Sequence, residues 1–452
     1  MSHLVALLSR INEDVTPILL STLKKILDPK EKTIQISLSN SVIKCKELPQ
    51  KLEKSHIALA TTAEPQENST YYLGSIQKNN SSNIFEISDP RIINFPYSAV
   101  KINGDSFSIA RDPVGTIPIY VGKNHKNYAI STQMKYLWAM GMEPKSIQPG
   151  NIMEVSPSGV IEKQIRKISQ PALQNESINS NVKTLDKLLK KTVTSMIPPD
   201  GNVALGFSGG IDSTILAHYL KENEIDISLV CVGLENSSEF EAAERAAYSL
   251  DLPLNVYKYP ISSVEENLDQ IIWIIEECNP VNVGIGISLL WATRRSRELG
   301  NTVFFSGGGA DELFGGYHKY LGKPCELVRS MIFNDVLHSY KKNYERDYKV
   351  CQSEGLDLKI PYANIELIEY GLSLPVSQKI PENPLDPRKI ILRALANKLG
   401  LPEDVSNKPK KAFQYSTGVN KVLLKLAKKN GLKLNEYLRA RFDKVKKEML
   451  IE

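Results

Sequence analysis

The segment Val203–Leu220, VALGFSGGIDSTILAHYL, restricts the fold of this chain more than any other part of it. The apolar run Val203–Phe207 has the length of a buried strand and is ended by glycines. After a short polar loop, Ser208–Ser213, the residues Thr214–Leu220 carry apolar side chains at helical spacing. The pattern predicts a strand, a tight loop and a helix.

This loop has the composition of an anion site. Backbone N–H groups in such a loop converge at the positive end of the helix, and the missing Cβ atoms of Gly209 and Gly210 let an anion approach closely. Ser208 and Ser213 add hydroxyl donors. Asp212 is a poor direct neighbour for phosphate but is explained by Mg²⁺ between the two. We expect a phosphate or pyrophosphate here. The alternative is a turn in which glycine and serine only permit the change of chain direction between the strand and the helix.

A second stretch, TVFFSGGGADELFGGY from Thr302 to Tyr317, repeats the pattern. The apolar strand Val303–Phe305 runs into glycines, and Asp311 follows closely. Two such loops can face one another across one nucleotide and one metal ion, which suits ATP with Mg²⁺. The alternative is a glycine-rich turn in which Asp311 and Glu312 cap the next helix.

Length and charge set broad limits. The 452 residues are enough for two or three domains. A net charge of +5 is modest for this length and does not indicate a nucleic-acid binder. The sequence has no run of eighteen apolar residues and no signal-peptide pattern at its start, so we expect a cytoplasmic protein without a membrane partner.

The cysteines predict neither a zinc site nor a disulfide framework, because they are scattered singly without a CxxC pair. We expect buried thiols in a reducing compartment. The five positions are Cys45, Cys231, Cys278, Cys325 and Cys351.

The order of patterns along the chain predicts an α/β protein. Residues 1–165 contain short strand-like runs, with a hairpin signal at Asn103-Gly104. Later strands alternate with helices, which predicts a parallel sheet with ligands beyond the carboxyl ends of its strands. The charge run Glu345–Asp347 is interpreted as a solvated face, and Val422–Glu452 as one or two lysine-rich surface helices.

With both loops in view, the chain resembles the asparagine synthetase family. Ser208–Ser213 matches the family's pyrophosphate loop, and Ser306–Tyr317 matches its second loop. Arg111–Gly115 resembles the RDPxG signature, Lys359–Tyr362 the RVPF segment, and Lys408–Phe413 the late basic loop. The likeness covers nearly the whole chain in the order of the family.

The resemblance implies an N-terminal glutaminase-like α/β sandwich domain in residues 1–168, expected to be inactive, and a linker in residues 169–181. Residues 182–452 would form a parallel-sheet α/β ATP-pyrophosphatase synthetase domain with a helical C-terminal part. Such an enzyme uses ATP and Mg²⁺ to adenylate a carboxylate, and an amine or ammonia then displaces AMP. Small molecules are the implied partners, a homodimer is compatible with the resemblance, and nucleic acid is not expected.

The resemblance also implies functional residues. Asp212, Asp311 and Lys410 would be catalytic, with Lys408 as the alternative lysine, and both aspartates would hold the metal. The residues implied for ATP binding are Phe207, Ser208, Gly209, Gly210, Asp212, Ser213, Val232, Ser306 and Gly307.

Three departures from the family bear on substrate and nitrogen source. Ser2 stands where the family's glutaminase cysteine follows the initiator Met, and the amide-binding segments are not recognisable, which favours an inactive glutaminase-like domain. Gly308 replaces a glutamate important to aspartate amidation, and Val283–Gly286 lacks a substrate-pairing arginine. A non-catalytic ATP-binding relative and a tRNA-modifying enzyme, whose class shares the SGGxDS loop, stay open as alternatives.

Overall fold

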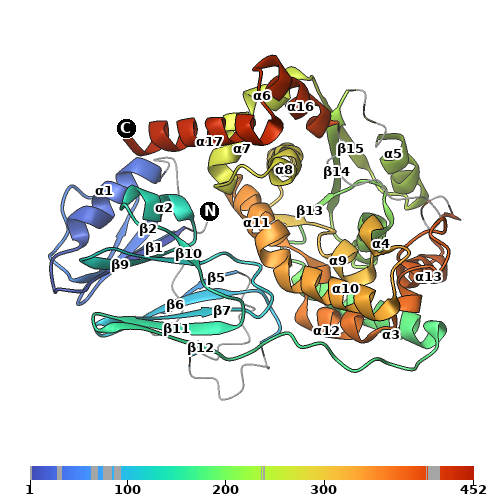
Figure 1. Ribbon diagram of the computed structural model, residues 1–452, viewed down its shortest axis with the longest axis horizontal. Coiled ribbons are helices and arrows are strands. Elements are labelled where there is room, and N and C mark those ends of the chain that lie inside the picture. The colour runs from blue at the N-terminus through green and yellow to red at the C-terminus, as the bar shows by residue number, and fades with distance from the viewer. Residues whose placement is uncertain are drawn as a thin grey trace. The chain divides into compact units, whose positions relative to one another are not determined.

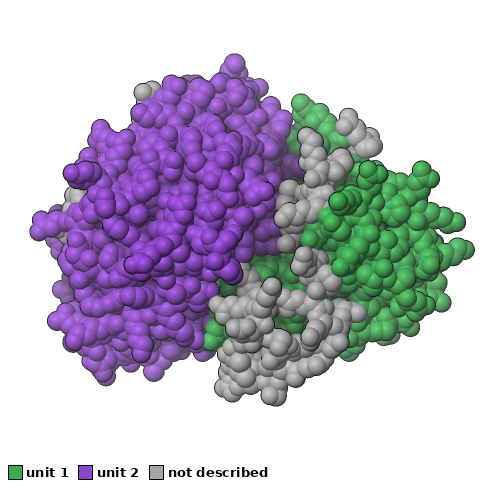
Figure 2. All heavy atoms as spheres, turned by 180° about the vertical axis from the view of Figure 1, so that it is seen from behind, with its two compact units in different colours: residues 1–167, 443–452 green, residues 168–442 purple. Residues whose placement is uncertain are grey.

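The computed structural model describes residues 3–27, 33–62, 70–74, 84–85, 93–235, 237, 240–403, 405 and 418–451 (Figure 1). The chain divides into two compact units, which Figure 2 colours separately. One unit contains Met1–Lys167 together with Asp443–Glu452, and the other contains Ile168–Phe442.

The first unit is rich in β-structure and contains two antiparallel sheets, as its alternating patterns predict. The strand orders are β10-β8-β9-β1-β4-β2-β3 and β12-β11-β7-β6-β5. Its elements are β1 (Leu4–Ser9), α1 (Thr16–Ile26), β2 (Ile34–Leu38), β3 (Val42–Cys45), β4 (Ile57–Thr61), β5 (Thr70–Leu73), β6 (Ser98–Asn103), β7 (Ser106–Arg111), β8 (Tyr120–Lys123), β9 (Asn127–Ser131), α2 (Met134–Ala139), β10 (Lys145–Ser146), β11 (Asn151–Ser156) and β12 (Gly159–Gln164).

Local turn chemistry sets the register of the second of these sheets. The predicted hairpin is confirmed, because Asn103 of β6 pairs with Ser106 of β7. Gly104 has a φ of +55°, which glycine adopts without a steric penalty. In the other sheet every residue of β1 is buried, so both faces of that central strand are covered.

The RDPVG segment is a buried structural junction of this unit. Arg111 has no exposed surface, and its guanidinium donates hydrogen bonds to the carbonyl oxygens of Ile147 and Gly115 at 2.7 Å and to the Ser146 hydroxyl at 3.0 Å. Asp112 accepts from the Gly115 N–H at 2.8 Å, and burial raises the pKa of its carboxyl group. The segment therefore ties β7 to the start of β8 and to the β10–β11 connection.

The second unit contains a parallel sheet of order β15-β14-β13-β16-β17, which confirms the predicted parallel α/β architecture. Its first elements are α3 (Ile178–Met196), β13 (Val203–Gly206), α4 (Ile211–Lys221), β14 (Ile227–Leu234), α5 (Phe240–Ser249), β15 (Leu254–Tyr259), α6 (Ser262–Glu266), α7 (Leu268–Ile275), α8 (Pro280–Glu298) and β16 (Val303–Phe305). The remaining elements are α9 (Ala310–Phe314), η2 (His318–Tyr320), α10 (Cys325–Ser339), η3 (Tyr340–Tyr344), α11 (Glu345–Ser353), β17 (Asp357–Lys359), η4 (Pro361–Ala363), α12 (Ile365–Ser373), η5 (Val376–Gln378), α13 (Ile390–Lys398), α16 (Val419–Lys429) and α17 (Leu434–Ile451), the last of which continues into the first unit.

Several expectations need correction. Helix α4 begins at Ile211, earlier than the apolar spacing suggests, so Asp212 lies in its first turn rather than in the loop. The charge run Glu345–Asp347 is not a solvated face, because all of it is buried in α11. The cysteines are not uniformly buried, since Cys325 is exposed. The tail does form a pair of helices, α16 and α17, and the described helices include none long and apolar enough to cross a membrane.

Candidate active site

The first glycine loop connects β13 to α4 at the centre of the parallel sheet. Gly209 has a φ of +64°, and a Cβ atom there would lie 2.3 Å from the carbonyl oxygen of Ala242, so only glycine fits. Hydrogen bonds to serine hydroxyls hold the loop, from the Gly210 N–H to Ser208 at 3.3 Å and from the Ser208 N–H to Ser213 at 3.4 Å. No side chain caps the N-terminus of α4, which leaves its first N–H groups directed at the loop.

The second glycine loop follows β16, the parallel neighbour of β13, so both loops leave the same edge of the sheet. Gly309 has a φ of +87° and precedes α9. A Cβ atom on Gly307 would lie 3.3 Å from the Cβ atom of Asp212, which shows that the two loops are in contact. Ser306 is anchored through its N–H, which donates to the carbonyl oxygen of Lys359 at 2.9 Å.

Lys389 joins the two loops, and the sequence interpretation missed it. Its Nζ lies 2.6 Å from both carboxylate oxygens of Asp212 and 2.7 Å from Oδ1 of Asp311. The residue is 2% exposed and precedes α13 with a φ of +63°. Because this single lysine lies 177 residues beyond Asp212, no local pattern marks it as part of the site.

Hydrogen bonds from nearby side chains hold the backbone at Asp212 and the side chain of Glu312, which follows Asp311. The Tyr362 hydroxyl, from the KIPY segment, donates to the carbonyl oxygen of Asp212 at 3.1 Å. Next to Asp311, Glu312 is 4% exposed and accepts hydrogen bonds from Tyr317 and, at 2.6 Å, from Asn343. Burial, followed by the charge of Asp311, raises the pKa of the Glu312 carboxyl group. Glu312 therefore ties α9 to Tyr317 and to η3.

The donor set fits a magnesium ion shared with phosphate. Asp212 and Asp311 supply hard carboxylate oxygens, and the Lys389 ammonium between them marks a position where positive charge is favoured. No cluster of three or more His, Cys, Asp or Glu side chains with metal-binding geometry occurs in the described parts of the chain. A pair of carboxylates completed by phosphate oxygens and water is the usual arrangement for Mg²⁺.

The other predicted site residues are either buried or lie outside the described residues. Phe207 and Val232 are each 3% exposed, and Val232 belongs to the hydrophobic core, so their role in an adenosine pocket stays a prediction. Lys408 and Lys410 lie outside the described residues, as does Ser2. A pocket of about 520 Å³ elsewhere in this unit is lined by residues of the α7–α8 turn and of α17, and none of them belongs to the loops.

Known proteins are similar to this chain in sequence. The sequence model of the asparagine synthase family matches residues 184–327 and 326–450, more than half of the chain. A protein of Methanocaldococcus jannaschii, provisionally named a glutamine-hydrolyzing asparagine synthetase, is 28% identical over 398 residues, which cover 76% of this chain and 72% of that protein. A glutamine-hydrolyzing asparagine synthetase of Zea mays is 23% identical over 62% of this chain, which spans 50% of that relative. The solved NMN synthetase of Francisella tularensis aligns over 61% of this chain and 94% of its own at 12% identity, with a TM-score of 0.30.

Proposed function

We propose, on the premise that the chain belongs to the asparagine synthase family, that it is an ATP-dependent ligase that adenylates a carboxylate and transfers the acyl group to ammonia or an amine. AMP and pyrophosphate are the other products, and aspartate or a related acid is the carboxylate. The observation that carries the proposal is the Asp212–Lys389–Asp311 bridge, which joins two glycine loops at the carboxyl ends of adjacent parallel strands.

Each part of the bridge has a chemical role in this proposal. The N–H groups of the first loop and of the α4 N-terminus bind the phosphates that leave as pyrophosphate. Lys389 and the neighbouring Arg393 of α13 supply positive charge at Asp212. Asp212 and Asp311 would hold Mg²⁺, which would neutralise further phosphate charge. The chain itself then contributes positioning and electrostatic stabilisation as the carboxylate displaces pyrophosphate from the α-phosphorus.

The test is the release of pyrophosphate from ATP in the presence of Mg²⁺, ammonia and a panel of carboxylates that includes aspartate. We expect release that depends on one carboxylate and is accompanied by AMP. Asp212→Asn should reduce the rate by roughly 100-fold or more, as loss of a preorganised electrostatic group does. Asp251→Asn, which changes a fully exposed aspartate, is the matched control. ATP binding without carboxylate-dependent release would refute the ligase function and favour a non-catalytic ATP-binding relative.

We also propose that ammonia or an amine, rather than glutamine, is the nitrogen donor. Ser2 in place of cysteine supports this, because a thiolate is the stronger nucleophile at neutral pH. The Arg111–Asp112 junction can be retained for its structural role alone, since it ties strands of the first unit together. Product formation with glutamine as the sole nitrogen source, at the rate seen with ammonia, would contradict this part of the proposal.

A further inference from the structure

Lys389 has the contacts of a cation shared by the two glycine loops. Its Nζ lies 2.6 Å from each carboxylate oxygen of Asp212 and 2.7 Å from Oδ1 of Asp311. Three of the four carboxylate oxygens of this pair therefore contact one ammonium group. Because Lys389 is almost fully buried, little water screens these contacts. Contact with carboxylate oxygens from more than one residue is also what a divalent cation requires.

The segment that follows α9 leaves space for the side chain of Lys389. A Cβ atom on Gly316 would lie 2.5 Å from Cε of Lys389 and closer still to Oδ1 of Asp311. Gly316 does not have a positive φ, so glycine is needed here for space and not for its backbone conformation. Packing thus fits the stem of the lysine as closely as the aspartates fit its ammonium group.

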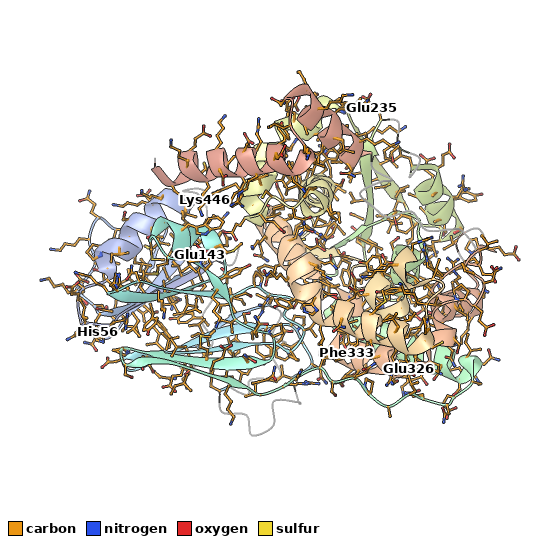
Figure 3. All side chains as sticks on the ribbon, viewed as in Figure 1. His56, Glu143, Glu235, Glu326, Phe333 and Lys446 are labelled. Atoms are coloured by element: carbon orange, nitrogen blue, oxygen red, sulfur yellow. The ribbon has the colours of Figure 1, made fainter. Side chains whose placement is uncertain are left out.

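The backbone of Lys389 is strained. Helix α13, which begins at Ile390, packs on α3 and α4 (Figure 1). Both glycine loops leave the carboxyl edge of the parallel sheet, where Figure 3 labels Glu235 directly after β14. Lys389 precedes α13 in the left-handed conformation, with φ +63° and ψ +45°, which is unfavourable for a residue with a Cβ atom. Strained residues of this kind persist where their surroundings fix them, and they occur at switch regions.

The ammonium group and Mg²⁺ cannot use these oxygens together. A lone pair that accepts from Nζ of Lys389 is not available to a metal ion, and two cations in contact repel each other. Lys389 and Mg²⁺ therefore compete for Asp212 and Asp311. Phosphate oxygens are strong acceptors for an ammonium group, so ATP offers Lys389 another anionic partner.

We propose that Lys389 is a positioning residue that holds Asp212 and Asp311 ready for Mg²⁺ and releases them only when ATP is bound, an inference that rests on the proposed ligase function. The ammonium group keeps two mutually repelling carboxylates side by side. It also lowers the affinity of the site for Mg²⁺ alone, because the ion pairs must break first. Phosphate oxygens compensate Lys389 for those ion pairs, so that metal and nucleotide bind together.

The test is Mg²⁺ binding to the full chain without nucleotide, measured by calorimetry. We expect Lys389→Gln to bind Mg²⁺ at least roughly tenfold more tightly than the unchanged protein, because it removes a unit charge that contacts both carboxylates. Lys389→Arg keeps the charge and should bind within about threefold of the unchanged protein. Arg393→Gln is the matched control: it removes a positive charge that acts on Asp212 but leaves Lys389 in place, and should also stay within about threefold.

Thermal unfolding without nucleotide gives a second readout. Asp212 and Asp311 repel each other when Lys389 is absent, so Lys389→Gln should have a lower Tm than the unchanged protein in Mg²⁺-free buffer. Added Mg²⁺ should raise the Tm of Lys389→Gln more than that of the unchanged protein, because the variant binds the metal more tightly. A lysine with a purely structural role predicts no such rescue by Mg²⁺.

Equal Mg²⁺ affinities of Lys389→Gln and the unchanged protein would overturn the proposal. An equal gain in Arg393→Gln, or a comparable gain in Lys389→Arg, would overturn it as well, since the effect would then not depend on the ammonium contacts. If Lys389→Gln stays unfolded at every Mg²⁺ concentration, the metal cannot replace the ammonium group and the proposal fails. These measurements use neither ATP nor a carboxylate substrate, so the absence of pyrophosphate release from the unchanged protein would refute the ligase function separately.

Discussion

Lys379 provides a stability prediction with a calculable magnitude. It lies between η5 and α13, is 2% exposed, and forms no ion pair with any carboxylate of the described residues. Burial, with a smaller contribution from the charge of Arg329, lowers the pKa of its ammonium group from 10.5 to about 7. The folded protein therefore holds this amine largely neutral under conditions in which the unfolded chain protonates it.

The sign follows from the proton count. Between pH 7 and pH 10.5 the unfolded state binds one more proton at Lys379 than the folded state, so stability rises with pH across this window. At about 1.4 kcal/mol per pH unit, the lysine costs about 4 kcal/mol at pH 7 and about 1 kcal/mol at pH 10. Lys379→Met keeps an apolar stem of similar length and removes the charge, so we expect the variant to be more stable by these amounts.

The assay is urea unfolding at pH 7 and pH 10, followed by tryptophan fluorescence in a Trp138→Phe background. Trp273 and Trp291 then report on the unit that contains Lys379. Lys421→Met, which changes an exposed lysine of α16, is the control and should stay within about 0.5 kcal/mol of the parent at both pH values. A stabilisation of Lys379→Met that does not shrink between pH 7 and pH 10 would refute the reasoning, as would a loss of stability at pH 7.

Two further substitutions test the loop and the first unit. Gly209→Ala should abolish ATP binding measured by calorimetry, because its Cβ atom would lie 2.3 Å from a carbonyl oxygen of α5, whereas the Cβ atom of Gly210→Ala would approach only a serine hydroxyl at 3.2 Å, so this variant should weaken binding less. Equal affinities would contradict the loop geometry. Arg111→Met should destabilise the first unit by at least roughly 3 kcal/mol in urea unfolding followed by Trp138 fluorescence, because it leaves buried acceptors unsatisfied. Exposed Lys24 provides the control substitution to Met, and equal stability of the two variants would contradict the structural role of Arg111.

The parts of the fold that were predicted from the sequence depend on local chemistry. The Asn103-Gly104 turn needs a positive φ, which glycine supplies, and the observed hairpin has that conformation. The parallel sheet follows from apolar strands that alternate with helical periodicity. The sequence pattern places the start of α4 too late, because Ile211 directly follows glycines and the helical spacing of apolar residues becomes visible only later in the helix.

The sequence by itself therefore determined the two strand–glycine loop–helix segments and their acids, because backbone conformation at glycine and hydrophobic periodicity are encoded in neighbouring residues. Only the tertiary structure decided which charges meet. Lys389 reaches Asp212 and Asp311 across the sheet edge. A run of charged residues has the same sequence pattern whether its side chains face water or a partner of opposite charge. Packing of the chain excludes water around Lys389, Asp212 and Asp311 and thereby makes these three charged residues parts of one site.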